Sequence, residues 1–77
     1  MNSRDLWDDA LIMQELDMLG TWADSVHISN KVGTLSPARV RIRLKALEQK
    51  GKVERRRVKG GAYHYRSIEP KEHGVKQ

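Results

Sequence analysis

The segment from Leu35 to Arg57 constrains the fold of this 77-residue chain more than any other. Ser36 followed by Pro37 is a strong start signal for a helix, because serine caps a first turn well and proline fits its first position. Gly51 is a matching stop signal. The segment therefore predicts a helix over residues 36–50, and an arginine-rich segment of strand character follows it at once.

Two faces of this helix differ in chemistry. Helical spacing gathers one apolar stripe for the core, made of Val40, Leu44 and Leu47. The opposite face carries Ala38, Arg41, Ile42, Lys45 and Gln49. An isoleucine at position 42 would point to water on this face and would add nothing to the buried core. A helix with a positive outer face has the size and charge to enter the major groove of a duplex.

Charge is divided unevenly along the chain. Residues 1–30 hold one base and six acids, whereas residues 31–77 hold fourteen bases and four acids, within a net charge of +5. A strongly basic half favours a polyanionic partner, with the acidic part turned away from it. The alternative interpretation is a solvated surface with a chance imbalance.

Length and composition exclude several classes of protein. A chain of this size forms one domain and buries roughly 60% of its unfolded surface, so a dimer interface would add useful stability. Cysteine is absent, and no apolar run reaches the length of a membrane span. The acidic beginning of the chain differs from a signal peptide. We expect a cytoplasmic protein without disulfides and without a membrane segment.

A first helix is predicted over residues 4–19, between a capping Ser3 and a terminating Gly20. It has two apolar stripes, although a small domain buries only one face of a surface helix. The first stripe is Ile12, Leu16 and Leu19, and the second is Trp7, Leu11, Gln14 and Met18. We expect the second stripe to contact another copy of the chain; alternatively, other elements of the same chain cover it.

Shorter elements complete the pattern. Residues 21–23 could form a brief strand, and Ser25 is predicted to cap a helix over residues 26–32. Gly60 and Gly61 suit the two-residue turn of a β-hairpin. That turn would pair Lys59 with Ala62.

The predicted hairpin register has chemical consequences. It sets Arg55 opposite Arg66 and Val53 opposite Ile68. Only the end of the hairpin that contains Val53 and Ile68 has the apolar character of a core. Opposed like charges destabilise an isolated sheet, so this pairing favours an anion alongside. Residues 1–69 would then be the domain, and residues 70–77 a flexible polar tail.

This order of elements resembles the winged helix-turn-helix domain of transcriptional regulators. Ile28, Ser29, Val32 and Gly33 match its second helix, and the run from Val40 to Val53 matches its third helix and the start of its wing. The run from Leu47 to Arg55 is also similar to very small regulators of fimbrial operons. The resemblance implies an α+β fold, with three helices and a C-terminal β-hairpin wing, and sequence-specific binding of double-stranded DNA. The second apolar stripe of the first helix predicts that the protein binds as a homodimer.

The resemblance also implies which residues contact DNA. The third helix would lie in the major groove, and the wing on the minor groove or backbone. Arginine grips guanine with two hydrogen bonds, and isoleucine or alanine can meet a thymine methyl. The recognition residues would be Ser36, Ala38, Arg39, Arg41, Ile42 and Lys45. The wing and backbone residues would be Lys31, Arg55, Arg56, Arg57, Lys59, Gly60, His64 and Arg66.

Several residues have simpler interpretations. We expect Trp22 to lie in the core, Tyr63 and Tyr65 to pack in the sheet, and Arg43 to serve packing or a phosphate. Lys31 could equally be a helix-end charge. The three histidines lack the spacing of metal ligands, and we expect no metal, cofactor or small-molecule ligand.

Three functions remain open at this point. No nucleophile and base stand in a recognisable pattern, so we do not expect an enzyme. Regulation through duplex DNA is favoured. Binding of RNA, single strands or a left-handed duplex is an alternative, although only four aromatic residues are available for stacking. A winged helix devoted to protein contacts is the third.

Overall fold

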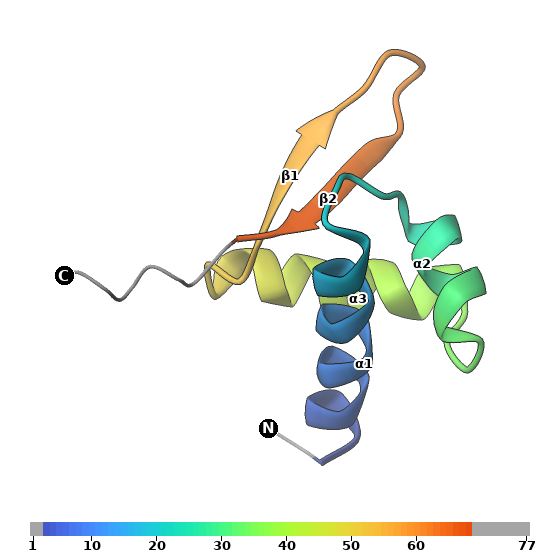
Figure 1. Ribbon diagram of the computed structural model, residues 1–77, viewed down its shortest axis with the longest axis vertical. Helices are drawn as coiled ribbons and strands as arrows, with labels where there is room; N and C mark the ends of the chain where they lie inside the picture. Colours follow the sequence, from blue (N-terminus) through green and yellow to red (C-terminus); the bar gives the residue numbers. More distant parts are fainter. Residues whose placement is uncertain (1–2, 69–77) are drawn as a thin grey trace, which may run out of the picture.

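The structure is a computed structural model that describes residues 3–68, in which three helices precede one antiparallel hairpin (Figure 1). The prediction of an α+β winged helix-turn-helix arrangement is confirmed. The predicted tail over 70–77 and the domain end at residue 69 lie outside the described residues. The elements are α1 (Ser3–Leu19), α2 (Ser25–Val32), α3 (Pro37–Gln49), β1 (Val53–Arg57) and β2 (Tyr63–Ser67).

One core joins all five elements. The predicted stripes of α1 and α3 supply most of it, since Ile12, Leu16, Val40 and Leu44 are fully buried. Figure 1 shows α3 crossing the molecule, with α1 on one side and the hairpin rising on the other. The remaining core residues are Ala23, Ile28, Leu47, Val53 and Tyr65.

Helix ends follow the local chemistry of capping. The Ser36 hydroxyl accepts a hydrogen bond from the Arg39 backbone N–H at 3.1 Å, and Pro37 occupies the first turn of α3, as predicted. The predicted cap of α2 was wrong by one residue. Asp24 is the cap, and its carboxylate accepts from the His27 N–H at 2.8 Å. Ser25 is instead the first residue of the helix and is buried.

The hairpin turn is longer than predicted. The Val58 N–H donates to the Ala62 carbonyl at 2.9 Å, and the Gly61 N–H donates to the Val58 carbonyl at 3.0 Å. The loop therefore comprises residues 59–61 rather than two glycines alone. Gly60 and Gly61 both adopt positive φ, 100° and 91°, which explains why glycine is needed there.

One extra loop residue shifts the whole register of the wing. Arg55 pairs with Tyr65, and Glu54 pairs with Arg66. The predicted opposition of two arginines is wrong, so it no longer supports an anion alongside the sheet. The Arg66 Nε instead donates to the Glu54 carboxylate at 2.7 Å. Val53 lies in the core as predicted, whereas Ile68 is 43% exposed.

The segment between α1 and α2 adds a short third pairing to the wing. The Ala23 N–H donates to the Tyr65 carbonyl at 2.9 Å, and the Tyr65 N–H donates to the Ala23 carbonyl at 2.8 Å. Of residues 21–23, which could form a brief strand by sequence, only Ala23 pairs with β2, as an isolated bridge. The bridge fixes that segment directly beside β2.

Candidate nucleic-acid interface

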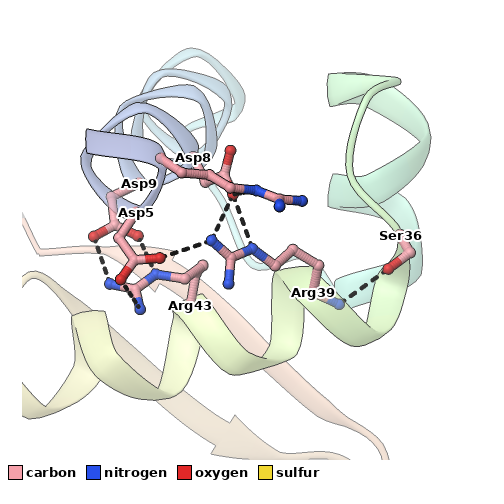
Figure 2. Close-up of polar contacts among 7 residues, drawn as sticks. Asp5, Asp8, Asp9, Ser36, Arg39 and Arg43 are labelled. Atoms are coloured by element: carbon pink, nitrogen blue, oxygen red, sulfur yellow. Dashed lines mark hydrogen bonds and ion pairs between the residues drawn. The ribbon is translucent and has the colours of Figure 1, made fainter. Parts of the chain in front are cut away.

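The side of α3 that faces α1 is closed by ion pairs. The Arg39 Nε donates to the Asp8 carboxylate at 2.8 Å, and its Nη2 donates to the Asp5 carboxylate at 2.8 Å. Figure 2 shows the Arg39 guanidinium reaching from α3 to both acids of α1. The hydrogen bond with Arg39 holds the pKa of Asp5 below its usual value, and the same bond raises the pKa of Arg39.

Arg43 is buried one turn farther along the same side. Its Nε and Nη2 donate to the two oxygens of the Asp9 carboxylate at 2.8 and 2.9 Å (Figure 2). Arg43 is 8% exposed and Asp9 is 7% exposed. The hydrogen bonds to Asp9 raise the pKa of Arg43. The expectation that Arg43 serves packing agrees with this position, since its charge is satisfied within the protein.

The position of Arg39 requires a correction to the predicted site. Its side chain was expected near base edges, on the open part of α3. The structure instead directs it to two carboxylates of α1, with 24% of the side chain exposed. The sequence places Arg39 and Arg41 only two residues apart, and helical geometry sends such neighbours to different sides. Arg39 therefore belongs to the contact between helices.

The opposite side of α3 faces the wing and the start of α2. The Arg41 Nη1 donates to the Ser25 hydroxyl at 3.3 Å. Farther along the helix, the Glu48 carboxylate lies 3.4 Å from the Arg55 Nε of the wing. Arg41 also lines a groove between α2 and the wing, together with Val26 and Tyr63. The wing is thus attached to α3 along one edge.

Between these two sides, α3 has an open face formed by Ala38, Ile42, Lys45 and Gln49. All four are exposed, as predicted, and Ile42 is 59% exposed. Arg41 is also exposed and borders this face. Within residues 3–68, no acidic side chain lies within ion-pair distance of Arg41 or Lys45. The helix therefore presents two uncompensated cations beside an exposed isoleucine.

On each face of the wing, one aromatic side chain contacts two arginines. On the face toward α3, the guanidinium carbons of Arg55 and Arg57 lie 4.3 and 5.7 Å from the centre of the Tyr63 ring. On the outer face, those of Arg56 and Arg66 lie 4.4 and 4.6 Å from the centre of a Trp22 ring. These distances are typical of cation–π contacts.

The aromatic residues differ partly from their predicted roles. Trp22 was expected in the core, and that expectation is wrong, because Trp22 is half-buried and lies outside the core cluster. Tyr65 packs in the sheet as expected, and its burial raises the pKa of its hydroxyl. Tyr63 is 38% exposed and contacts arginines. The predicted register hid the stacking, because it placed Arg66 opposite Arg55 and therefore on the other face of the hairpin from Arg56.

The other predicted DNA contacts are spread over three places. Ser36 lies at the start of α3 and is exposed, with its hydroxyl used for capping. Lys31 is exposed in the last turn of α2. Lys59 and Gly60 are exposed at the wing tip, and His64 is half-buried in β2. The structure gathers Arg41 and Lys45 on α3 and most of the other predicted basic contacts along the wing, whereas Lys31 lies apart on α2.

The second apolar stripe of α1 is open to solvent along much of its length. Trp7 is 70% exposed and Met18 is 73% exposed, while Gln14 is exposed and Leu11 is half-buried. Leu6, which the stripe prediction omitted, is 58% exposed beside Trp7. Other elements of the described chain therefore leave this face uncovered.

Residues 3–68 contain neither a cluster of potential metal ligands nor a membrane-spanning helix. No group of three or more histidine, cysteine, aspartate or glutamate side chains in this part of the chain is arranged to hold a metal ion. None of its helices combines the length and apolar character needed to cross a membrane.

The sequence matches no family model and no curated protein. Among solved structures, the fold is similar to the reduced form of the transcriptional regulator YodB from B. subtilis, with a TM-score of 0.66 and 25% identity. The similarity covers 79% of this chain and 60% of that one, so the chain spans less than two thirds of that regulator's length. This likeness and the element order together show a winged helix-turn-helix fold.

Proposed function

We propose that this chain is a transcriptional regulator that binds double-stranded DNA in a sequence-specific manner. In this proposal α3 lies in the major groove, and the wing lies on the adjacent minor groove or backbone. The fold neighbour, a transcriptional regulator, supports a regulatory role through DNA.

The observation that carries the proposal is the state of the cations on α3. Arg39 and Arg43 are satisfied by acids of α1, whereas Arg41 and Lys45 have no acidic partner within residues 3–68. A duplex would supply the missing anions as phosphates, and acceptors for Arg41 on base edges. Ile42, exposed between them, would contact a thymine methyl.

The wing supports the same conclusion through its charge. Arg56, Arg57 and Lys59 follow one another toward the tip, and no acid of the described residues pairs with them. Arg55 and Arg66, by contrast, are held by Glu48 and Glu54. We expect the first three to contact phosphates or a narrow minor groove, and the last two to keep the wing in position.

The first test is the salt dependence of duplex binding. If six to eight phosphates are neutralised, a plot of log binding constant against log salt concentration should have a slope of roughly −5 to −7. Fluorescence anisotropy of a labelled duplex over a series of salt concentrations measures it. Binding that does not respond to salt would contradict the proposal.

A matched control distinguishes a defined interface from overall charge. Arg4 lies at the start of α1, and its side chain is 78% exposed. Arg4→Gln and Arg57→Gln each remove one positive charge. Only Arg57→Gln should reduce the magnitude of the slope, by about 1. Equal reductions would indicate attraction without a docked geometry.

Sequence specificity is tested by selecting bound duplexes from a random pool. We expect recovery of a defined site, and competition by single-stranded DNA or RNA should be weak. Stronger binding of single strands would replace the duplex proposal with its nucleic-acid alternative. Recovery of no preferred sequence would limit the protein to non-specific DNA binding.

We also propose that two copies associate through the exposed stripe of α1, namely Trp7, Leu11, Gln14 and Met18. The support is the exposure of its large apolar side chains, which a partner surface would remove from water. Sedimentation of the wild-type protein should show a dimer. The double variant Trp7→Glu with Leu11→Glu should be a folded monomer. A wild-type monomer at high concentration would contradict the homodimer. A selected palindromic site would support it, because half-sites mirror two-fold symmetry.

A further inference from the structure

The outer face of the wing contains a stack that the predicted site did not include. The Trp22 side chain contacts both Arg56 and Arg66, whose guanidinium carbons are 4.4 and 4.6 Å from a Trp22 ring centre. The two arginines differ in their other contacts. Arg66 donates to Glu54 at 2.7 Å, whereas Arg56 has no acidic partner among the described residues.

The backbone next to Trp22 is hydrogen-bonded to β2. Ala23 exchanges two backbone hydrogen bonds with Tyr65, at 2.9 and 2.8 Å, and is 4% exposed. This bridge fixes the backbone next to Trp22 beside β2. The Arg66 guanidinium, which is anchored by Glu54, also contacts a Trp22 ring. The indole is thus held by a fixed backbone and by one anchored arginine, in addition to its contact with Arg56.

A long cationic side chain loses conformational freedom when it binds a phosphate, and that loss weakens binding. A guanidinium stacked on an aromatic face is already partly ordered, and stacking leaves its edge N–H groups available as donors. Trp22 would therefore prepare Arg56 for phosphate contact without neutralising its charge. An acidic partner would order the side chain equally well but would compete with DNA.

We infer that Trp22 is a positioning residue for DNA binding, which holds Arg56 of the wing in place for contact with a phosphate. The inference rests on the proposed function, since it concerns how the wing meets the same duplex. It gives the segment between α1 and α2 a role in DNA binding, in addition to the roles proposed for α3 and the wing.

The test is a double-mutant cycle on duplex binding. Trp22→Leu removes the ring and should weaken binding about two- to fivefold, the range expected for an exposed cation–π contact. Trp22→Leu should have no further effect once Arg56→Gln is present, because the positioned charge is then already lost. Trp22→Phe keeps an aromatic face and should restore affinity to within about twofold of wild type.

Lys59 offers a matched control for the cycle. It is an exposed cation at the tip of the same wing, and none of the ring contacts of the described residues involves it. Trp22→Leu and Lys59→Gln should therefore act independently, with effects that multiply. If Trp22 only supports the fold, its loss should weaken binding equally in the wild-type, Arg56→Gln and Lys59→Gln backgrounds. That result would overturn the inference.

A measurement without DNA separates this inference from the proposed function. In the free protein, the Arg56 Nε–H proton should be shifted upfield by the indole ring current in the NMR spectrum. The shift should disappear in Trp22→Leu and persist in Trp22→Phe. A wild-type protein that binds duplex but shows no such shift would overturn the inference alone. A protein that shows the shift but binds no duplex would overturn the proposed function, and the inference with it.

Discussion

Two pairs of cations on α3 have the same spacing and opposite surroundings. Arg39 and Arg43 are four residues apart and contact acids of α1. Arg41 and Lys45 are also four residues apart, and no acid of the described chain pairs with them. A shift of two residues along a helix turns a side chain by roughly 200°. The helix thus uses one pair to hold the fold and leaves the other pair for a partner.

The comparison shows how an acidic first helix and a basic third helix can coexist in one small domain. Asp5, Asp8 and Asp9 point toward α3, where Arg39 and Arg43 offset most of their negative charge. These acids would otherwise repel a duplex. Because these acids form ion pairs within the protein, the open face of α3 keeps its positive charge.

The largest expected effect concerns the buried pair. Arg43→Met should lower the free energy of unfolding by about 3 kcal/mol, because it leaves the Asp9 carboxylate buried without its partner. The matching change on the other pair, Arg41→Met, should cost about 0.5 kcal/mol or less, since Arg41 is exposed. Urea unfolding followed by circular dichroism measures both. Equal losses would mean that the two pairs do not differ as described.

DNA binding should show the reverse order. Arg41→Gln should lower the binding free energy for the selected site by about 1–3 kcal/mol and relax its sequence preference. Arg39→Gln should leave that preference unchanged, because its guanidinium contacts Asp5 and Asp8 instead of bases. Anisotropy with the selected duplex and with single-base variants makes the comparison. A relaxed preference in Arg39→Gln would place that residue back among the base contacts.

A smaller effect is expected from pH, because the side chains of Asp5 and Arg39 are partly exposed. The folded protein holds the pKa of Asp5 below its unfolded value. The stability from this pair is therefore complete above the unfolded pKa of about 3.9 and is lost as pH falls below it. Unfolding midpoints in urea at pH 5 and pH 3 should differ less in Asp5→Asn than in wild type. An unchanged difference would mean that Asp5 contributes nothing to acid sensitivity.

The smallest change belongs to the free pair. Lys45→Gln should reduce the magnitude of the salt slope by about 1 and weaken binding to all duplexes alike, if Lys45 contacts a phosphate. The free energy of unfolding of this variant should equal that of the wild type, because Lys45 is exposed and makes no ion pair within residues 3–68. A change in base preference would assign Lys45 to direct readout instead.

The sequence predicted the helices well because their signals are local. Ser36 and Pro37 mark one boundary, and Val40, Leu44 and Leu47 define the buried side at helical spacing. The cap of α2 was missed by one residue because Asp24 and Ser25 are adjacent and both types cap helices.

The wing register and the ion pairs could not be read in the same way. A Gly-Gly pair suits loops of two or three residues, and the difference moves every cross-strand partner. Arg39 and Arg41 are indistinguishable by composition, and only the packing of α1 against α3 decides which one meets acids. The Trp22 stack depends on both the bridge at Ala23 and the corrected register. Long-range contacts of this kind leave no periodic trace in a sequence.

The open face of α3 has one more consequence. The side chains of Ala38, Ile42 and Gln49 are exposed and make no hydrogen bond or ion pair with the described part of the chain. Residues at these positions can therefore be exchanged for others with little cost in folding. The scaffold could be retargeted to new operators by altering three side chains, while the acid-bound arginines on the neighbouring side stay untouched.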